Sequence, residues 1–123
     1  MITLTQAVLY TDTDGRARFR DEPLILSEGT PAARLSTLMA SGGWQFRHSP
    51  VGFWSGFHCT GTPQWLLVLQ GRMEIGLQDG STREFGPGEY FYSGDTLPAG
   101  TSFDPGLHGH RSRQVGDEPL VTL

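Results

Sequence analysis

Histidine is the residue type in this sequence whose chemistry is easiest to place. The chain has 123 residues and four histidines. His108 and His110 are separated by one glycine, so a strand would direct both rings to one face. His58 lies far upstream, and only a fold can bring it to the other two. Neutral imidazoles bind divalent metals and exchange protons near neutral pH, so these three residues are candidate metal ligands. Equally, His58 and His110 could be strand histidines hydrogen-bonded to a neighbour, and His108 could be a loop residue at the mouth of a barrel.

Other polar residues could complete a site with these histidines. Gln64 lies six positions after His58, which places both side chains on one face if the strand is regular. A glutamine side chain is a weak replacement for a carboxylate ligand, whereas Asp95 and Asp104 precede His110 in a long loop and could supply one. Both aspartates also fit ordinary turns, so either role is open for them.

Aromatic side chains are predicted within or beside the strands, where they can wall an apolar cavity or simply fill the core. Tyr90 and Tyr92 alternate with Phe91 and share a face, so one phenol could reach a ligand. The candidate ligand-binding residues are Gln64, Tyr90, Tyr92, Trp54 and Asp95.

The strand around which these residues must be arranged is 65–69. Its five apolar residues, WLLVL, precede Gln70 and Gly71, and the run is too short for a helix, so we predict a strand buried on both faces. Beyond Gly71, apolar and polar residues alternate until Asp79-Gly80, a tight hairpin turn. A second turn, Gly86-Pro87-Gly88, leads into a strand at 89–93. These segments predict a β-meander.

The N-terminal third contains a predicted hairpin and a segment with two competing interpretations. Residues 6–10 and 16–20 can pair across a turn at 12–15, and 24–26 is predicted to be a short buried strand. Thr30, Pro31 and Gly42 would fit the ends of a helix over 31–40. Apolar residues also alternate in 31–40, and 41–43 can form a turn. We predict a strand over 31–40 that pairs with 44–49.

The order of these features resembles the cupin superfamily, which consists of small β-barrels of the jelly-roll type. The likeness covers roughly residues 44–123 and rests on His58 and Gln64, on WLLVLQGRMEIGLQDGSTREFGPGEYF and on GHRSRQVGDEPL. It implies an all-β fold, a single-domain cupin-type jelly-roll β-barrel over residues 1–123. Residues 1–43 would form N-terminal strands and 44–123 the barrel motifs.

Metal-binding cupins have two histidines one residue apart, then a glutamate, and a further histidine on a later strand. The resemblance aligns His58 and His110 with two of these histidines. It aligns Thr60 with the other histidine and Gln64 with the glutamate. A divalent metal is implied, with zinc, iron, nickel and manganese all open. Because Thr60 and Gln64 depart from the motif, binding without a metal is open too.

Composition narrows the partners and the compartment. The net charge is −4, and the nine basic residues, all arginine, form no cluster, so nucleic acid is not an expected partner. No apolar run approaches the ~20 residues of a membrane helix, so no membrane association is expected. The single cysteine, Cys59, cannot form an intramolecular disulfide and suits a reducing, cytoplasmic compartment. It neighbours His58 but would face the other side of a strand, as a small hydrophobic residue.

Three functions remain open from the sequence. The first is a small-molecule-binding cupin, with or without a metal, whose ligand lies in the barrel cavity. The second is a metal-dependent enzyme of the dioxygenase or isomerase type. The third is a dimeric association module. We predict a homodimer because the N-terminal strands carry more apolar residues than one small barrel can cover, and exposed sheet edges need pairing.

Overall fold

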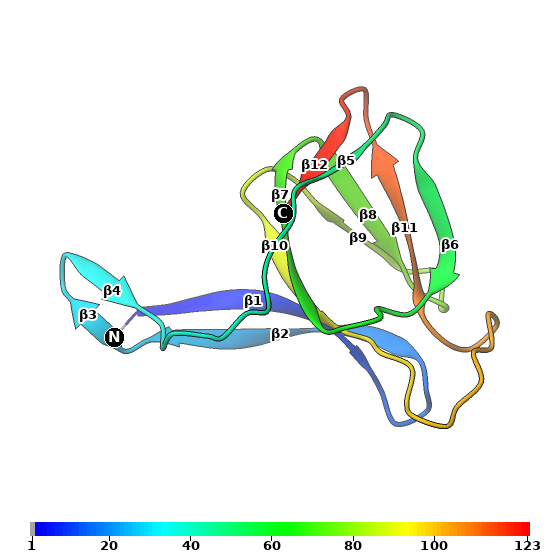
Figure 1. Cartoon of the computed structure of the whole chain (residues 1–123), viewed down its shortest axis with the longest axis horizontal. Helices are drawn as coiled ribbons and strands as arrows, with labels where there is room; N and C mark the ends of the chain where they lie inside the picture. Colours follow the sequence, from blue (N-terminus) through cyan, green and yellow to red (C-terminus); the bar gives the residue numbers. More distant parts are fainter. Residues whose placement is uncertain (1) are drawn as a thin grey trace.

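The computed structural model describes residues 2–123 and is all-β, as predicted (Figure 1). No helix occurs in this range. The strands are β1 (Ile2–Thr11), β2 (Ala17–Leu26), β3 (Glu28–Thr30), β4 (Ala33–Leu35), β5 (Arg47–Ser49), β6 (Trp54–His58), β7 (Gln64–Gln70), β8 (Arg72–Gly76), β9 (Thr82–Phe85), β10 (Tyr90–Gly94), β11 (His110–Val115) and β12 (Leu120–Thr122). The part of the chain that the structure describes therefore has no helix that could cross a membrane.

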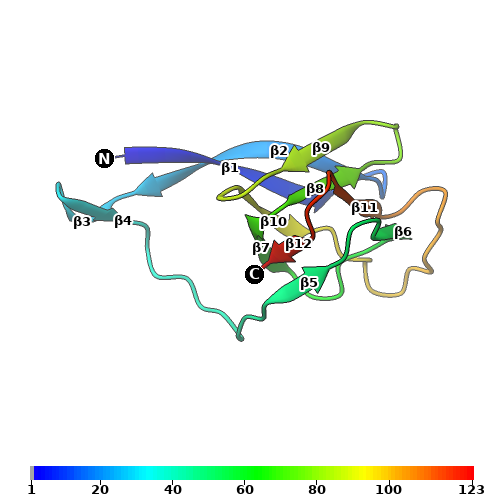
Figure 2. The same cartoon turned by 90° about the horizontal axis from the view of Figure 1, so that it is seen from above.

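Two sheets make up the body of the molecule in a jelly-roll-like arrangement. The larger sheet has the order β2-β1-β10-β7-β12-β5, and the smaller one has the order β6-β11-β8-β9. Figure 2 shows the two sheets from above, with β1, β10 and β7 in one and β8, β9 and β11 in the other. Within residues 2–123 no strand pairing joins the two sheets, so they are not closed as the predicted barrel.

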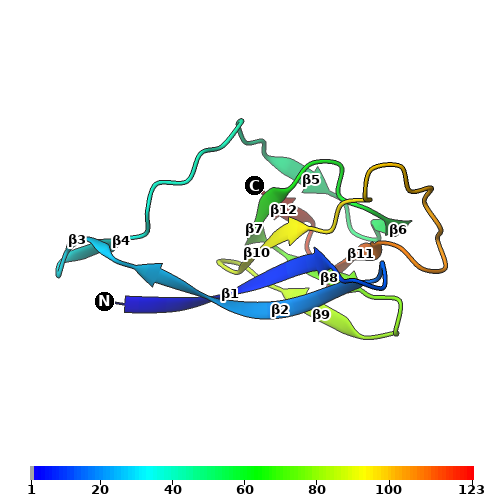
Figure 3. The same cartoon turned by 90° about the horizontal axis from the view of Figure 1, so that it is seen from below.

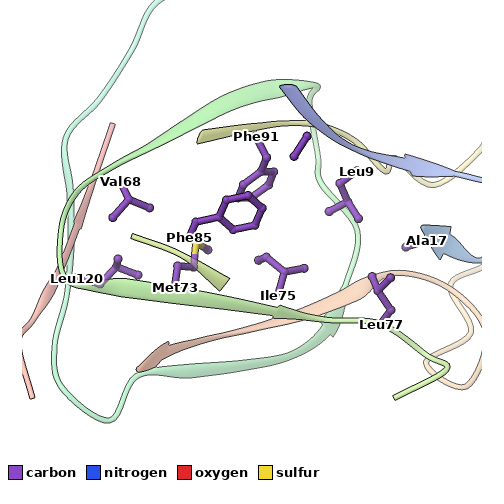
Figure 4. Close-up of a cluster of buried hydrophobic side chains, with 10 residues drawn as sticks. Leu9, Ala17, Val68, Met73, Ile75, Leu77, Phe85, Phe91 and Leu120 are labelled. Atoms are coloured by element: carbon purple, nitrogen blue, oxygen red, sulfur yellow. The ribbon is translucent and has the colours of Figure 1, made fainter. Parts of the chain in front are cut away.

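A hydrophobic core fills the space between the sheets (Figure 4). Leu9, Phe91 and Val68 contribute from the larger sheet, and Ile75 and Phe85 from the smaller one. The rings of Phe85 and Phe91 lie 4.8 Å apart between their centroids, so the aromatic contact bridges the sheets. The alternation after Gly71 thus has its predicted cause, because one face of β8 lines this core.

The two predicted hairpins form, but the predicted β-meander does not, because β7 and β10 pair with each other in the larger sheet while β8 and β9 pair in the smaller one. β1 pairs with β2 from Ile2↔Leu26 to Thr11↔Ala17, and β8 pairs with β9 across the turn at Asp79-Gly80. Gly80 has φ of 86°, a left-handed conformation that glycine adopts without a steric cost. The first hairpin is longer than expected, and residues 24–26 continue β2 instead of forming a separate buried strand.

Strand β7 is not buried on both faces, which corrects the prediction from its apolar run. Val68 faces the core and is fully buried, but Leu67 and Leu69 are 36% and 46% exposed. The outer face of β7 is therefore partly exposed in the described residues. An apolar run reports a preference for burial, and it cannot reveal whether the same chain supplies the covering layer.

The predicted pairing of 31–40 with 44–49 is wrong. Ala33–Leu35 pairs instead with Glu28–Thr30, residues 36–46 have no regular secondary structure, and Arg47–Ser49 pairs with Leu120–Thr122 at the edge of the larger sheet. The competing helix does not form either. Strand β12, which arrives from the C-terminus, provides a partner for 47–49 that local sequence could not indicate.

The ends of β1 and β2 project from the body as an arm, which we define as residues 2–6 and 22–35 (Figures 1 and 3). β10 pairs only with Ala7–Tyr10 of β1, so residues 2–6 pair with β2 alone. Residues 36–46 then run from the arm back to β5 as an exposed loop. Arm and loop carry exposed apolar side chains, among them Leu38 at 99% and Trp44 at 71%.

Candidate functional site

His58 and His110 lie side by side at one end of the smaller sheet. β6 and β11 are antiparallel, and the two histidines are directly opposite each other in the register. Residues opposite each other in such a pair point to the same face. The centroids of their rings are 4.7 Å apart. Two side chains from distant parts of the sequence thus form one pair.

A local irregularity and a glycine bring the two rings together. Between the pairs His110↔His58 and Ser112↔Ser55, two steps along β11 match three along β6, so β6 is bulged. Gly109 has φ of 83°, and a Cβ there would lie 2.7 Å from the carbonyl carbon of His58. Only glycine permits this approach of the two backbones without a shift.

His110 is held by a buried carboxylate. Its Nδ1 lies 2.8 Å from Oδ2 of Asp95, and Thr11 donates its hydroxyl hydrogen to Oδ1 of the same carboxylate at 2.7 Å. Asp95 is fully buried and His110 is 5% exposed. An ionised carboxylate only accepts hydrogen bonds, so Nδ1 of His110 carries the hydrogen and Nε2 keeps its lone pair.

His58 has the same tautomer for a different reason. Its Nδ1 lies 2.7 Å from the carbonyl oxygen of Gly56, which can only accept, so Nδ1 donates and Nε2 again keeps its lone pair. His58 is half-buried. Within residues 2–123, the hydrogen bonds of both rings use Nδ1, and neither ring has one at Nε2. Neither Nε2 atom is among the fully buried polar atoms that lack a partner. Both Nε2 atoms therefore face accessible space.

The residues between and around the pair form a polar layer. Thr60 donates its backbone N–H to the backbone oxygen of Asp95 at 2.8 Å, and its hydroxyl lies 2.5 Å from that of Ser93. Burial raises the pKa of the Cys59 thiol, and the negative charge of Asp95 adds to the effect. The thiol thus stays protonated at neutral pH, which agrees with a small hydrophobic role.

The structure places His108 apart from this pair. Strand β11 begins at His110, and the left-handed Gly109 ends the alternation that would have set both rings on one face. The Nδ1 of His108 accepts the backbone N–H of Asp104 at 2.9 Å, so His108 stabilises the preceding loop. Asp104 itself accepts the N–H of Gly106 in a turn.

The predicted ligand-binding aromatic residues also lie elsewhere. Phe91 faces the core, so its neighbours Tyr90 and Tyr92 face outward, where Trp65 packs against them at 5.8 and 4.9 Å between ring centroids. Trp54 is 72% exposed. The alternation correctly put the two tyrosines on one face, but it could not say which face was internal.

Gln64 and Asp95 are the two predicted ligand-binding residues on the interior side of the larger sheet. Gln64 is opposite Ser93 in the register of β7 and β10, and is exposed at the end of its strand. Among residues 2–123 no three His, Cys, Asp or Glu side chains are grouped so as to hold a metal ion. The side chains offer two imidazole nitrogens, with Asp95 committed to His110.

Thr11 is the site residue that the sequence did not predict. It is 84 positions from Asp95, on the first strand, and no motif marks it. Two open surface hollows lie away from the pair, one beside Gly71 and Gly116 and one beside Leu35. We place the site at the histidine pair because its polar groups are buried and aligned, whereas those hollows have no such arrangement.

The sequence matches no family model, and no curated protein is significantly similar to it. The chemistry of the site must therefore be argued from its own geometry.

Proposed function

We propose that this protein is a small-molecule-binding member of the cupin type whose ligand is anchored by His58 and His110. The observation that carries the proposal is the pairing of two imidazoles 4.7 Å apart, each with Nδ1 engaged by an oxygen atom. Two neighbouring lone pairs at accessible nitrogens form an anchor for hydrogen-bond donors or for a cation.

The electrostatics of the site favour a ligand that is not an anion. Asp95 contributes a negative charge, and its one ion-pair partner in residues 2–123 is His110. The arginines pair elsewhere; Arg113 and Arg111, on the strand of His110, both contact Glu74 on the other face. A carboxylate or phosphate ligand would therefore find a like charge and no guanidinium.

A metal-dependent enzyme is the second candidate. Metal-ligating histidines donate their other ring N–H to a carboxylate or a backbone carbonyl, and both rings here do so. The side chains present supply part of a coordination shell for a divalent ion. His58 and His110 would hold the ion, while Thr60 and Gln64 occupy the positions where the resemblance expects a histidine and a glutamate. Bound there, a metal would supply Lewis-acid chemistry, with solvent or substrate completing its coordination.

A homodimer is proposed alongside either function. The exposed apolar side chains of the arm and of loop 36–46, together with the uncovered outer face of β7, support it. A lone two-stranded ribbon is marginally stable in water, so residues 2–6 and 22–26 gain most from a second copy.

Native mass spectrometry of untagged protein tests the proposed function. We expect a bound species of constant mass above that of the 13.5 kDa chain, retained in His48→Ala and lost in His110→Ala. His48 is an exposed histidine on β5 and serves as the matched control. A bound species that persists in His110→Ala would place the ligand elsewhere and overturn the assignment.

A further inference from the structure

Asp95 is a buried carboxylate without a guanidinium or ammonium partner in residues 2–123. Each of its two oxygens has one donor, Thr11 at Oδ1 and His110 at Oδ2. A carboxylate taken out of water loses roughly several kcal/mol of hydration free energy, and two neutral donors restore only part of it. An apolar residue would fill this position at a smaller cost to stability, so packing does not account for Asp95.

We infer that Asp95 is a positioning residue that holds His110 as the Nδ1–H tautomer. The role follows from the geometry, since the 2.8 Å contact joins Oδ2 to Nδ1 and leaves Nε2 as the free acceptor. Thr11 fixes the carboxylate in turn, through a bond from the end of β1. The inference deepens the proposed function and rests on it, because the tautomer matters only if Nε2 meets a ligand.

His58 gives the inference an internal reference. Its tautomer is set by the backbone carbonyl of Gly56, which no side-chain substitution at Asp95 removes. With Asp95 present the pair offers two acceptors. With His110 in the opposite tautomer the pair would offer one acceptor and one donor, and it could no longer hold a divalent cation between two nitrogen lone pairs.

The variant Asp95→Leu isolates this role because it nearly keeps the size of the side chain and removes both carboxylate oxygens. Asp95→Asn would not, since its amide could turn its oxygen to Nδ1 of His110 and its NH₂ group to the hydroxyl of Thr11, which can also accept. In Asp95→Leu the Nδ1–H of His110 has no side-chain acceptor, so nothing holds that tautomer and the hydrogen can move to Nε2. Thr11→Val is the matched control, since it removes one bond to Asp95 and leaves the carboxylate beside the imidazole.

The test is long-range ¹H–¹⁵N correlation NMR of the labelled full chain at about pH 8, above the pKa of about 6.5 of an ordinary imidazole. Zn²⁺ titration by calorimetry accompanies it as the binding probe. We expect Nδ1–H at both His58 and His110 in the wild type and in Thr11→Val. In Asp95→Leu, His110 alone should lose its Nδ1–H signal and show Nε2–H, and Zn²⁺ affinity should fall about 10–100-fold.

The two readouts separate the inference from the proposed function. Nε2–H at His110 in the wild type, or an unchanged tautomer in Asp95→Leu, would overturn the positioning role. The wild-type measurement stands even where Asp95→Leu does not fold. The expected tautomers without Zn²⁺ uptake would support the positioning role and count against the metal form of the proposed function.

Discussion

Gly109→Ala should separate the two halves of the candidate site. Gly109 has φ of 83°, and an alanine in the left-handed region costs about 1–2 kcal/mol. Its Cβ would also overlap the backbone of His58, at 2.7 Å from the carbonyl carbon and 3.0 Å from the nitrogen. Backbone atoms cannot rotate away as a side chain can, so β6 and β11 must move apart, at a further cost of about 1–3 kcal/mol. We therefore expect a loss of about 2–5 kcal/mol in the free energy of unfolding.

Gly88→Ala is the matched control for this substitution. Gly88 has φ of 84°, and a Cβ there would have no atom within 4 Å. It should cost only the backbone strain of about 1–2 kcal/mol. Urea unfolding gives the stabilities of both variants, and calorimetry gives their Zn²⁺ affinities. We expect Gly109→Ala to lower the affinity at least about tenfold and Gly88→Ala to leave it unchanged. Equal losses of stability and equal affinities in the two variants would refute the argument that close approach at Gly109 builds the site.

Two further predictions concern stability and assembly. Hydrogen bonds from Arg113 hold the pKa of Glu74 below its ordinary value. Glu74→Gln should therefore lower the free energy of unfolding by roughly 1–2 kcal/mol at pH 7. This loss should shrink as the pH falls from the ordinary glutamate pKa through the lowered one, because protonation removes the same charge from the wild type. Urea unfolding at neutral and acidic pH measures it, and a cost that is the same at both would contradict the assignment. Light scattering should give a dimer for the wild type and more monomer for Trp44→Glu, since Trp44 is 71% exposed in the single chain. A wild-type monomer mass over a broad concentration range would exclude the dimer.

The parts of the fold that sequence could predict are those in which local pattern and turn chemistry agree. The alternation in β8, the turn at Asp79-Gly80 and the first hairpin all form as predicted, because each depends on residues that are close in sequence. Residues 31–49 do not, because the strand partner of Arg47–Ser49 comes from Leu120–Thr122 at the other end of the chain.

In the candidate site, too, the features that depend on distant parts of the chain were the ones that local sequence did not predict. The registers of β6 and β11 place His58 and His110 together, and the family resemblance was the signal that linked them. The bond from Thr11 to Asp95 spans 84 positions and depends on the parallel pairing of β1 with β10, which no local pattern specifies. Tyr90 and Tyr92 share a face as predicted, and that face is the outer one; alternation fixes which residues share a face and leaves open which face is covered.

Zn²⁺ titration of four untagged proteins tests the central claim most directly, namely that His58 and His110 together form the binding site. The proteins are the wild type, His58→Ala, His110→Ala and the control His48→Ala. The account predicts one Zn²⁺ per chain for the wild type and for His48→Ala, and a loss of that uptake in each of the other two. Equal uptake by all four proteins would contradict it, and no uptake by the wild type would contradict its metal form.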